Sequence, residues 1–596
     1  MRFRPIAVSL FCLGLATAQQ IDSGGFERNL AGPLSSRADS DAERQAFDQL
    51  STERDPHRRR QLAGEFINRY SRSWLLATVY QFAAAASLDL GDYGDALTEG
   101  RRSLRILPEN PALLVAMANV EAGLHQTKQA RQDASDTLLW LRVFAGPSTE
   151  KAADWEATRA TIEAAARLIL TRTGGVPADE QPPSGPPLTF AGSESCKPCH
   201  AVIYEAWRNT GMSRMLSPIH DSRLLTDFTQ GEFRDSSGRV VARFGGGMQP
   251  YFEFDRGNGE WKRYPVRFTI GSKWQQAYAT ELSDGRLFVF PIQYSAVHKR
   301  WVNYWSLIDL PGTERDNVAH FPQLSPAFSY QRNCAVCHTS QLRLARLDDK
   351  SFEQDAYREP GVNCEMCHGP SAEHVAAMRA GHAAEAGAQV PPFRFSKMDN
   401  VEGTLICGQC HRQSALRLLA RGGEMNYTHK APYFDLLLSQ PYIELGNRPF
   451  YRDGRFRETT YIGEAFLRSA CFRRGGAQCA SCHDPHGQDA AENPVSLKFR
   501  KDPDRMCLQC HGEIAARLTA HTHHAASSRG SRCVACHMPP TMNGLMVAAA
   551  SHQIDDVPDA QMTARFGEKD SPNACLICHA DKDTGWLLGQ LMQWQH

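Results

Sequence analysis

One five-residue pattern, Cys-x-x-Cys-His, occurs eight times between residues 196 and 579. We number the copies as motifs 1 to 8, and their first cysteines are Cys196, Cys334, Cys364, Cys407, Cys479, Cys507, Cys533 and Cys575. Their second cysteines are Cys199, Cys337, Cys367, Cys410, Cys482, Cys510, Cys536 and Cys578. Their histidines are His200, His338, His368, His411, His483, His511, His537 and His579. The motifs therefore account for sixteen of the 18 cysteines in the chain.

This spacing is the attachment signal for c-type haem. Positions i, i+3 and i+4 share one face of a helical turn. Two thiols can therefore bind the two haem vinyl groups while the imidazole ligates the iron from the same side. Zinc sites and redox-active disulfides also use Cys-x-x-Cys, but neither needs a histidine after every second cysteine. The sequence thus predicts eight covalently bound haem c groups, with the motif histidines as proximal iron ligands.

The second axial ligand of each iron decides between electron transfer alone and substrate binding. His374 and His486 closely follow motifs 3 and 5, and we expect each to ligate a neighbouring haem rather than its own. His524 and His552 are the other two preferred distal ligands. The haem region contains twelve histidines outside the motifs, these four included. Further candidates among them are His220, His320, His429, His521 and His523.

The first eighteen residues have the pattern of an export signal. Arg2 and Arg4 precede an apolar run over residues 6–15, and Ala16-Thr17-Ala18 forms a cleavage site. The sequence predicts that residues 1–18 are removed and that the mature chain contains no transmembrane segment. A periplasmic or extracellular location follows, which is also where haem c is attached.

Residues 41–171 contain no motif and are Ala-rich, with a helical pattern. The turn at Gly91-Asp92 and the closing Pro111 resemble one tetratricopeptide repeat. We expect five to seven helices here, because such repeats need neighbours to bury their faces. The region is interpreted either as a docking surface for a redox partner or as a helical cap on the haem domain.

A Pro- and Gly-rich linker over residues 172–188 separates these helices from a haem domain over residues 189–596. Alternating residues and hairpin turns predict a small antiparallel β insert at about 230–305, with its aromatic residues in a core. The rest should consist of short helices and loops, so the fold class is mainly α. Equal numbers of basic and acidic residues, 66 each, argue against a nucleic-acid partner.

Several phrases beside the motifs resemble the multihaem cytochrome c superfamily, over roughly residues 190–585. They are Ser469-Ala470-Cys471-Phe472, His523-His524, Cys536-His537-Met538-Pro539 and Pro572-Asn573-Ala574-Cys575. The superfamily includes tetrahaem electron carriers, hydroxylamine oxidoreductase and octahaem nitrite or tetrathionate reductases. The chain is more closely similar to bacterial multihaem cytochromes with tetratricopeptide repeats, which implies haem binding and electron transfer. Met212 stands where many relatives have a histidine, so it is a further candidate distal ligand, with packing as the alternative.

Three functions fit these observations. The first is an exported octahaem carrier that passes electrons in respiration along mostly bis-His haems. The second is a multihaem oxidoreductase of the nitrite, hydroxylamine or sulfur-oxyanion class, with one open haem. The third is a structural subunit of a homo-oligomer, an extracellular haem filament or a membrane-associated complex, with the helical repeats as its assembly surface.

Overall fold

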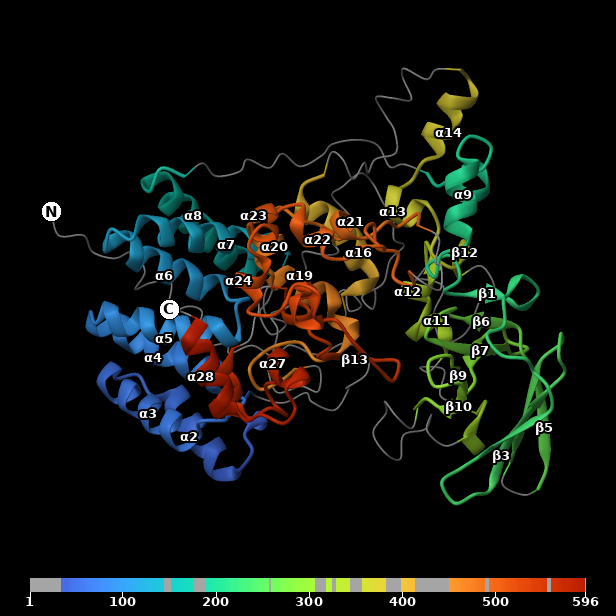
Figure 1. The fold of residues 1–596 in the computed structure, drawn as a ribbon, viewed down its shortest axis with the longest axis horizontal. Helices are drawn as coiled ribbons and strands as arrows, with labels where there is room; N and C mark the ends of the chain where they lie inside the picture. Colours follow the sequence, from blue (N-terminus) through green and yellow to red (C-terminus); the bar gives the residue numbers. More distant parts are fainter. Residues whose placement is uncertain are drawn as a thin grey trace.

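The computed structural model of the protein describes residues 34–143, 152–175, 189–256, 259–305, 318–323, 329–342, 356–381, 398–412, 450–487, 493–554 and 559–594. Figure 1 shows N-terminal helices on the left, short helices with loops in the centre, and β-sheets on the right. The predicted mixture of helices with small antiparallel sheets is confirmed. Among the described residues, no helix combines the length and hydropathy that a membrane span requires.

The N-terminal region follows a short 3-10 turn, η1 (Leu34–Arg37), and consists of consecutive antiparallel helices. The helices are α2 (Asp41–Thr52), α3 (Pro56–Arg69), α4 (Leu76–Leu90), α5 (Tyr93–Ile106), α6 (Pro111–Gly123), α7 (Thr127–Val143) and α8 (Ala152–Arg172). Side chains of Ser40, Asp55 and Asn110 cap three of them. Gly91 ends α4 with a φ of 79°, which glycine adopts without strain. The helical prediction is confirmed, whereas the tetratricopeptide class stays a prediction.

The N-terminal helices share one hydrophobic core with the haem domain. Leu113 and Met117 of α6 belong to the same buried cluster as Leu405, Phe466 and Phe472. A buried ion pair joins Glu109 to Arg468, whose side chains are 1% and 2% exposed. Gly454 lies against the carbonyl oxygen of Ile106, only 2.0 Å from where a Cβ would be placed. These contacts make the helices an integral part of the haem domain.

The β insert contains two main antiparallel sheets. Their strands are β1 (Ser217–Pro218), β2 (Gly231–Arg234), β3 (Val240–Gly245), β4 (Tyr251–Asp255), β5 (Trp261–Pro265), β6 (Phe268–Ile270), β7 (Gln275–Glu281), β8 (Leu287–Val289), β9 (Ile292–Ser295) and β10 (Arg300–Asn303). One sheet has the order β2-β3-β4-β5, and the other has β1-β6-β7-β9-β10 with β8 beside β7. Phe228, Phe252, Phe254 and Phe290 lie in one buried aromatic cluster, so the predicted aromatic core is present.

The remaining elements are short and irregularly connected, as predicted. Before motif 4 they are η2 (Ser193–Ser195), α9 (Ala201–Arg208), η3 (Ile219–Asp221), η4 (Val318–His320), α11 (Tyr330–Asn333), α12 (Ala335–His338), β11 (Thr339–Ser340), β12 (Glu359–Pro360), α13 (Glu365–His368) and α14 (Ala372–Arg379). From motif 4 onward they are α16 (Asn400–His411), η9 (Thr459–Tyr461), α19 (Ile462–Arg468), α20 (Ala470–Arg473), α21 (Cys479–Cys482), α22 (Arg505–Leu508), α23 (Gly512–Ala515), α24 (Leu518–Thr522), η10 (Arg529–Ser531), α25 (Cys533–His537), β13 (Met542–Gly544), β14 (Val547–Ala549), α26 (Ala560–Phe566), α27 (Ala574–Cys578) and α28 (Thr584–Trp594).

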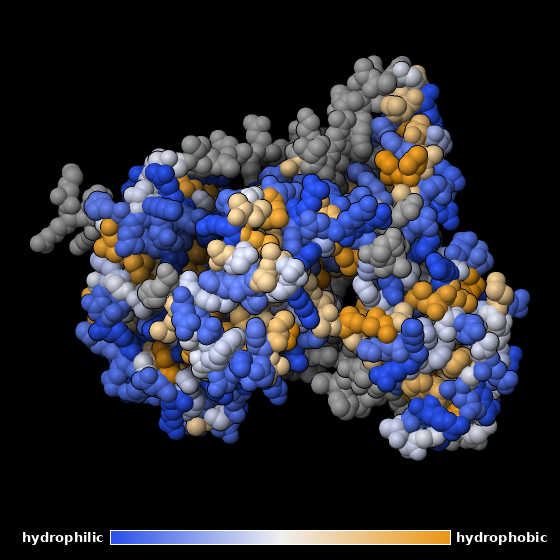
Figure 2. Space-filling view, viewed as in Figure 1, coloured by the Kyte–Doolittle hydropathy of each residue, from blue (hydrophilic) through white to orange (hydrophobic). Residues whose placement is uncertain are grey.

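The surface seen in Figure 2 is mostly hydrophilic, with hydrophobic residues gathered at a few places. One of these is the protrusion at the upper right, which α9 and α14 form in Figure 1. Val202 and Ile203 of α9 are 85% and 46% exposed there, directly after motif 1. Apolar side chains thus reach solvent beside the first motif.

Candidate haem-binding site

Each motif forms a single helical turn that places its first cysteine and its histidine on one face. The backbone N–H of the histidine donates to the backbone carbonyl of the first cysteine at 2.9 Å in motif 1, 3.1 Å in motif 2 and 2.8 Å in motif 8. The same bond occurs in motifs 3, 5 and 6. None of the sixteen motif cysteines forms a disulfide. This is the geometry that two thioether bonds and one iron ligand require.

A cavity of about 3050 Å³ runs along the motifs in the centre of the molecule. Cysteines of motifs 2 to 8 and the histidines of most of them line its wall. Pockets for one small ligand have volumes of about 300–1,000 Å³, so this cavity has the size for several large groups side by side. Apolar residues such as Ile270, Val289 and Phe466 complete the wall. The residues present therefore fit covalently attached macrocycles.

Thiols of different motifs lie next to one another. Hydrogen-bonded pairs join motifs 1 and 3 (Cys196, Cys364), 4 and 5 (Cys407, Cys479), 6 and 7 (Cys507, Cys533), and 2 and 4 (Cys337, Cys410). In three more pairs the pKa of one thiol is raised by burial and by the nearness of the second cysteine: Cys367 near Cys410, Cys482 near Cys510, and Cys536 near Cys578. These contacts connect all eight motifs into one array.

The array has a regular pattern with one branch. In chain order the contacts run through motifs 1, 3, 4, 5, 6, 7 and 8. First cysteines are hydrogen-bonded in pairs 1–3, 4–5 and 6–7, whereas in pairs 3–4, 5–6 and 7–8 the second cysteine of one motif lies near both cysteines of the next. Motif 2 joins from the side, where the Cys337 sulfur lies 4.0 Å from the carbonyl oxygen of Cys410. Motif 4 is therefore the junction.

Four motif histidines each have a second histidine ring nearby, and three of these pairs line the cavity. The ring centroids are 5.9 Å apart for His368 and His486, 6.4 Å for His483 and His552, 6.2 Å for His537 and His521, and 6.2 Å for His579 and His524. Metal–imidazole bonds of about 2.0–2.1 Å put the centroids of two imidazoles on opposite sides of one metal roughly 6.3 Å apart. The four pairs have this separation.

Hydrogen bonds at Nδ1 fix the orientation of several of these rings. Nδ1–H of His483 donates to the carbonyl of Val495 at 2.8 Å, and Nδ1–H of His552 donates to that of Ala550 at 3.1 Å. His537 and His524 donate to backbone carbonyls in the same way. Such bonds select the tautomer in which Nε2 carries a lone pair. In the His483–His552 pair, both Nε2 atoms are thus free for a metal.

Burial keeps imidazoles neutral at the centre of the array. Burial, assisted by the nearby His411, lowers the pKa of His338 to about 4. Burial also lowers the pKa of His552 to about 4, although its bond to the Ala550 carbonyl opposes the shift. The pKa of His411 is lowered by burial and by His483. A metal ligand must be deprotonated, and these three rings satisfy that condition at neutral pH.

The other predicted distal histidines have different environments. His220 is exposed, with Nε2 at 3.4 Å from a carboxylate oxygen of Asp221, and His320 is exposed at the end of η4. His523 stacks on Trp594 with a centroid distance of 4.4 Å, which is direct ring contact. His374 is half-buried in α14. His429 lies outside the described residues, as do His382 and His596.

Met212 lies in the cavity wall and packs against the central hydrophobic cluster. Its carbonyl oxygen accepts a hydrogen bond of 3.0 Å from the N–H of Val362, two residues before motif 3. Among the described residues, its sulfur makes no hydrogen bond to a motif histidine. The surroundings of Met212 in the structure thus fit a packing role, the alternative to iron ligation.

Two carboxylates that position motifs were missed by the sequence analysis. Glu365 lies inside motif 3 and accepts hydrogen bonds from the N–H groups of Ala191, Gly192 and Ser371 at 2.8–2.9 Å, which ties motif 1 to motif 3. Asp504 accepts from the N–H of Cys533 at 3.0 Å and so ties motif 6 to motif 7. An acidic residue within or three residues before a motif is the signal that points to this role.

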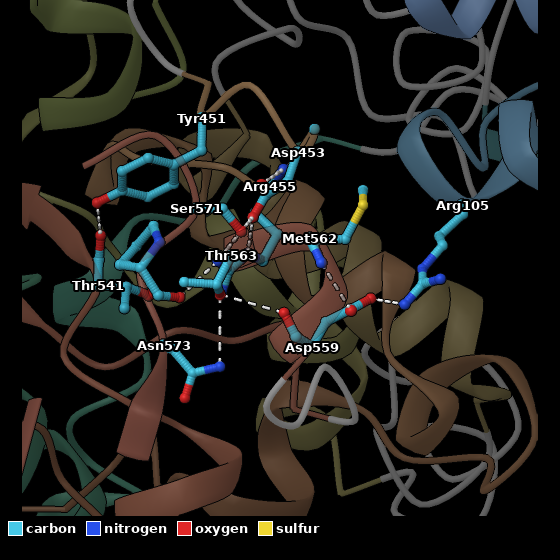
Figure 3. Close-up of polar contacts among 12 residues, drawn as sticks. Arg105, Tyr451, Asp453, Arg455, Thr541, Asp559, Met562, Thr563, Ser571 and Asn573 are labelled. Atoms are coloured by element: carbon cyan, nitrogen blue, oxygen red, sulfur yellow. Dashed lines mark hydrogen bonds and ion pairs between the residues drawn. The ribbon is translucent and has the colours of Figure 1, made fainter. Parts of the chain in front are cut away.

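A polar network holds motif 8 in place (Figure 3). The Asn573 side chain accepts from the N–H of Cys575 at 2.9 Å and begins α27. The guanidinium of Arg455 donates to the carbonyl of Pro572 at 2.6 Å, and Asp453 accepts from Ser571 at 2.7 Å. An ion pair between Arg105 and Asp559 connects the same region to α5. The Pro572-Asn573-Ala574-Cys575 phrase therefore acts by positioning the last motif.

Comparisons with known proteins agree with the motifs. The model of the doubled CXXCH motif family matches residues 472–516, and that of the cytochrome c554 and c-prime family matches residues 304–369. The crystal structure of the outer cell wall cytochrome OcwA is similar at 17% identity, with a TM-score of 0.42, over 68% of this chain and 87% of that one. No curated protein matches the chain significantly. The eight motifs and the two family models together support a multihaem c-type cytochrome with covalently bound haem.

Proposed function

We propose that the chain is an exported octahaem cytochrome that carries electrons in respiration along a continuous line of haems. The observation that carries this proposal is the set of thiol contacts connecting all eight motifs. Each thiol would hold the edge of its macrocycle through one thioether bond. Contacts between thiols of different motifs thus keep neighbouring cofactors close together.

The proposed route follows motifs 1, 3, 4, 5, 6, 7 and 8, with motif 2 as a branch at motif 4. The haem groups supply reversible one-electron chemistry at iron. The chain supplies their order, their spacing and their axial ligands. Motif 1 lies beside the exposed apolar residues Val202 and Ile203, which favours that end of the line for exchange of electrons with a redox partner.

Four distal ligands are proposed from the facing rings: His486 for motif 3, His552 for motif 5, His521 for motif 7 and His524 for motif 8. Nδ1 bonds to backbone carbonyls support the last two assignments through His537 and His524. His486 thereby ligates a haem other than the one whose motif it follows.

His374 is proposed as the distal ligand of motif 1. The N–H of Ala372 at the start of α14 donates to the carbonyl of Thr189 at 3.0 Å, and Glu365 holds residues 191 and 192. His220, His320, His429, His523 and Met212 remain candidates for the other irons.

Export and the role of the N-terminal helices are also proposals. Covalent attachment of haem c and the composition of residues 1–18 support a periplasmic or extracellular location. The core shared by α6 with the haem domain supports the helical-cap interpretation over a separate docking module. An oligomer or haem filament stays a prediction, which light scattering of the purified protein tests.

Electron paramagnetic resonance and mass spectrometry test the central proposal. The mass should correspond to eight haems on a chain without residues 1–18. The oxidised protein should show low-spin signals for the bis-His irons of motifs 3, 5, 7 and 8. Fewer than eight haems, or high-spin iron at those four motifs, would contradict it.

A further inference from the structure

We propose that the haem of motif 2 binds a small exogenous molecule, in a chamber whose wall carries the buried side chains of Gln275 and Gln293. The molecule is a nitrogen- or oxygen-donor ligand of iron that also carries an N–H or O–H group. This inference rests on the proposed octahaem array and assigns a separate task to its branch.

Motif 2 has a special position in the array. One of its thiols, that of Cys337, lies beside Cys410 of motif 4. The line from motif 1 to motif 8 is complete without it. A haem at this position is not needed to bridge two others, but it can exchange electrons with the junction.

The histidine of motif 2 also differs from those of the bis-His pairs. In the part of the chain that the structure describes, no histidine ring faces His338 at the 5.9–6.4 Å separation of the four pairs. Its Nδ1 is buried and has no hydrogen-bond partner, whereas His483 and His537 donate to backbone carbonyls. The interior around His338 is therefore built differently.

A sheet face forms the wall beside this motif. Ala277 and Ala279 of β7 and Val289 of β8 pack in one cluster with Ala335, which lies between the two cysteines of motif 2. Gln275 precedes these alanines by two and four residues, so it projects from the same face of β7. Gln275, Gln293 and His338 all line the central cavity.

The two glutamines present an unsatisfied acceptor inside this wall. They are 7% and 2% exposed, and Nε2 of Gln275 donates to Oε1 of Gln293. Oε1 of Gln275 is buried without a hydrogen-bond partner. Buried polar groups are usually satisfied, and exceptions call for an explanation. A ligand with an N–H or O–H group supplies the missing donor.

Matched probes separate the iron bond from the hydrogen bond. Carbon monoxide tests for open ferrous iron in the intact holoprotein, and we expect about one equivalent to bind. Imidazole and 1-methylimidazole both ligate ferric haem through nitrogen, but only imidazole keeps an N–H. We expect Gln275→Leu to lower the affinity ratio of imidazole to 1-methylimidazole about fivefold, the usual effect of one hydrogen bond.

Two variants serve as controls. Gln275→Glu retains an acceptor oxygen and should preserve the ratio, because burial favours the neutral carboxyl form. Gln81→Leu removes an amide of α4 that accepts from Asn110 at 3.1 Å and should leave the ratio unchanged. Haem content of each variant shows whether it has assembled.

The possible outcomes distinguish this inference from the proposed function. If carbon monoxide does not bind and every haem is low-spin, the chamber is wrong while the electron line stands. An affinity ratio that Gln275→Leu leaves unchanged also overturns the chamber. Loss of low-spin signals at motifs 3, 5, 7 and 8 in the wild type would instead overturn the proposed function.

Discussion

Motif 5 and motif 2 have the same five-residue pattern but differ in everything around it. At motif 5, His483 faces His552 at 6.4 Å and both rings donate from Nδ1 to backbone carbonyls. At motif 2, Ala335 packs beside a sheet and the buried Nδ1 of His338 has no hydrogen-bond partner. The pattern thus determines where a haem is attached, while distant segments of the chain determine which second axial ligand its iron receives.

The largest effect is expected from removing the junction. Cys407→Ser combined with Cys410→Ser deletes the haem of motif 4, which links motifs 1, 2 and 3 to motifs 5 to 8. Reduction by a partner in stopped-flow should then change from one phase to two. The matched control is Cys196→Ser with Cys199→Ser, which also leaves seven haems but removes only an end of the line. Two phases in the control, or one in the junction variant, would contradict the proposed route.

Removal of its distal histidine should convert motif 5 into a second open haem. His552→Ala removes the ring opposite His483, so one high-spin ferric signal should appear, with carbon monoxide binding increased by one equivalent. His552→Met should keep the iron low-spin and raise its potential within the range of roughly 0.8 V that axial ligands span. His523→Ala should change neither the ferric spin state nor the binding of carbon monoxide, since that ring stacks on Trp594.

An effect on stability is expected at the carboxylate that joins motifs 1 and 3. Glu365→Gln replaces one acceptor oxygen by an amide that faces a backbone N–H. The free energy of unfolding should fall by about 2 kcal/mol, the usual value for a hydrogen bond to a charged group. Glu373→Gln is the control, because Glu373 accepts longer bonds of 3.1–3.3 Å from Thr189 at the surface. Urea denaturation should separate the two variants, and equal midpoints would contradict this role of Glu365.

Much of the candidate site was accessible from the sequence because haem attachment is local. The spacing of thiols and imidazole within one helical turn is encoded in five residues, and the family models support that interpretation. The hairpin between β7 and β8 also follows from a local signal, because an Asp-Gly pair such as Asp284-Gly285 favours a tight turn, and Gly285 has a φ of 82°. Short helices and an aromatic β core followed from composition in the same way.

The arrangement of the motifs was not accessible, because it depends on contacts between distant residues. Cys196 meets Cys364 rather than a cysteine of motif 2, and Cys337 meets Cys410. His521 and His523 are two positions apart, yet one faces His537 and the other stacks on Trp594. No local pattern distinguishes them, since packing of α28 against this loop decides which ring turns toward which partner.

The smallest effect is expected from Tyr330, which lies in the motif 2 region without serving the chamber. Its side chain is fully buried, its hydroxyl has no partner, and its ring lies 6.3 Å from that of His338. Tyr330→Phe should change the free energy of unfolding by less than about 1 kcal/mol, because it removes an unsatisfied polar group.

Tyr451→Phe is the matched control, because that buried hydroxyl donates to the carbonyl of Thr541 at 2.7 Å. It should cost about 1 kcal/mol. If Tyr330→Phe is the more destabilising variant, or shifts the spectrum of bound carbon monoxide, the Tyr330 hydroxyl has a partner in the holoprotein. Motif 2 would then be supported by α11 as well as by the sheet, which would extend its contrast with motif 5 to a second element.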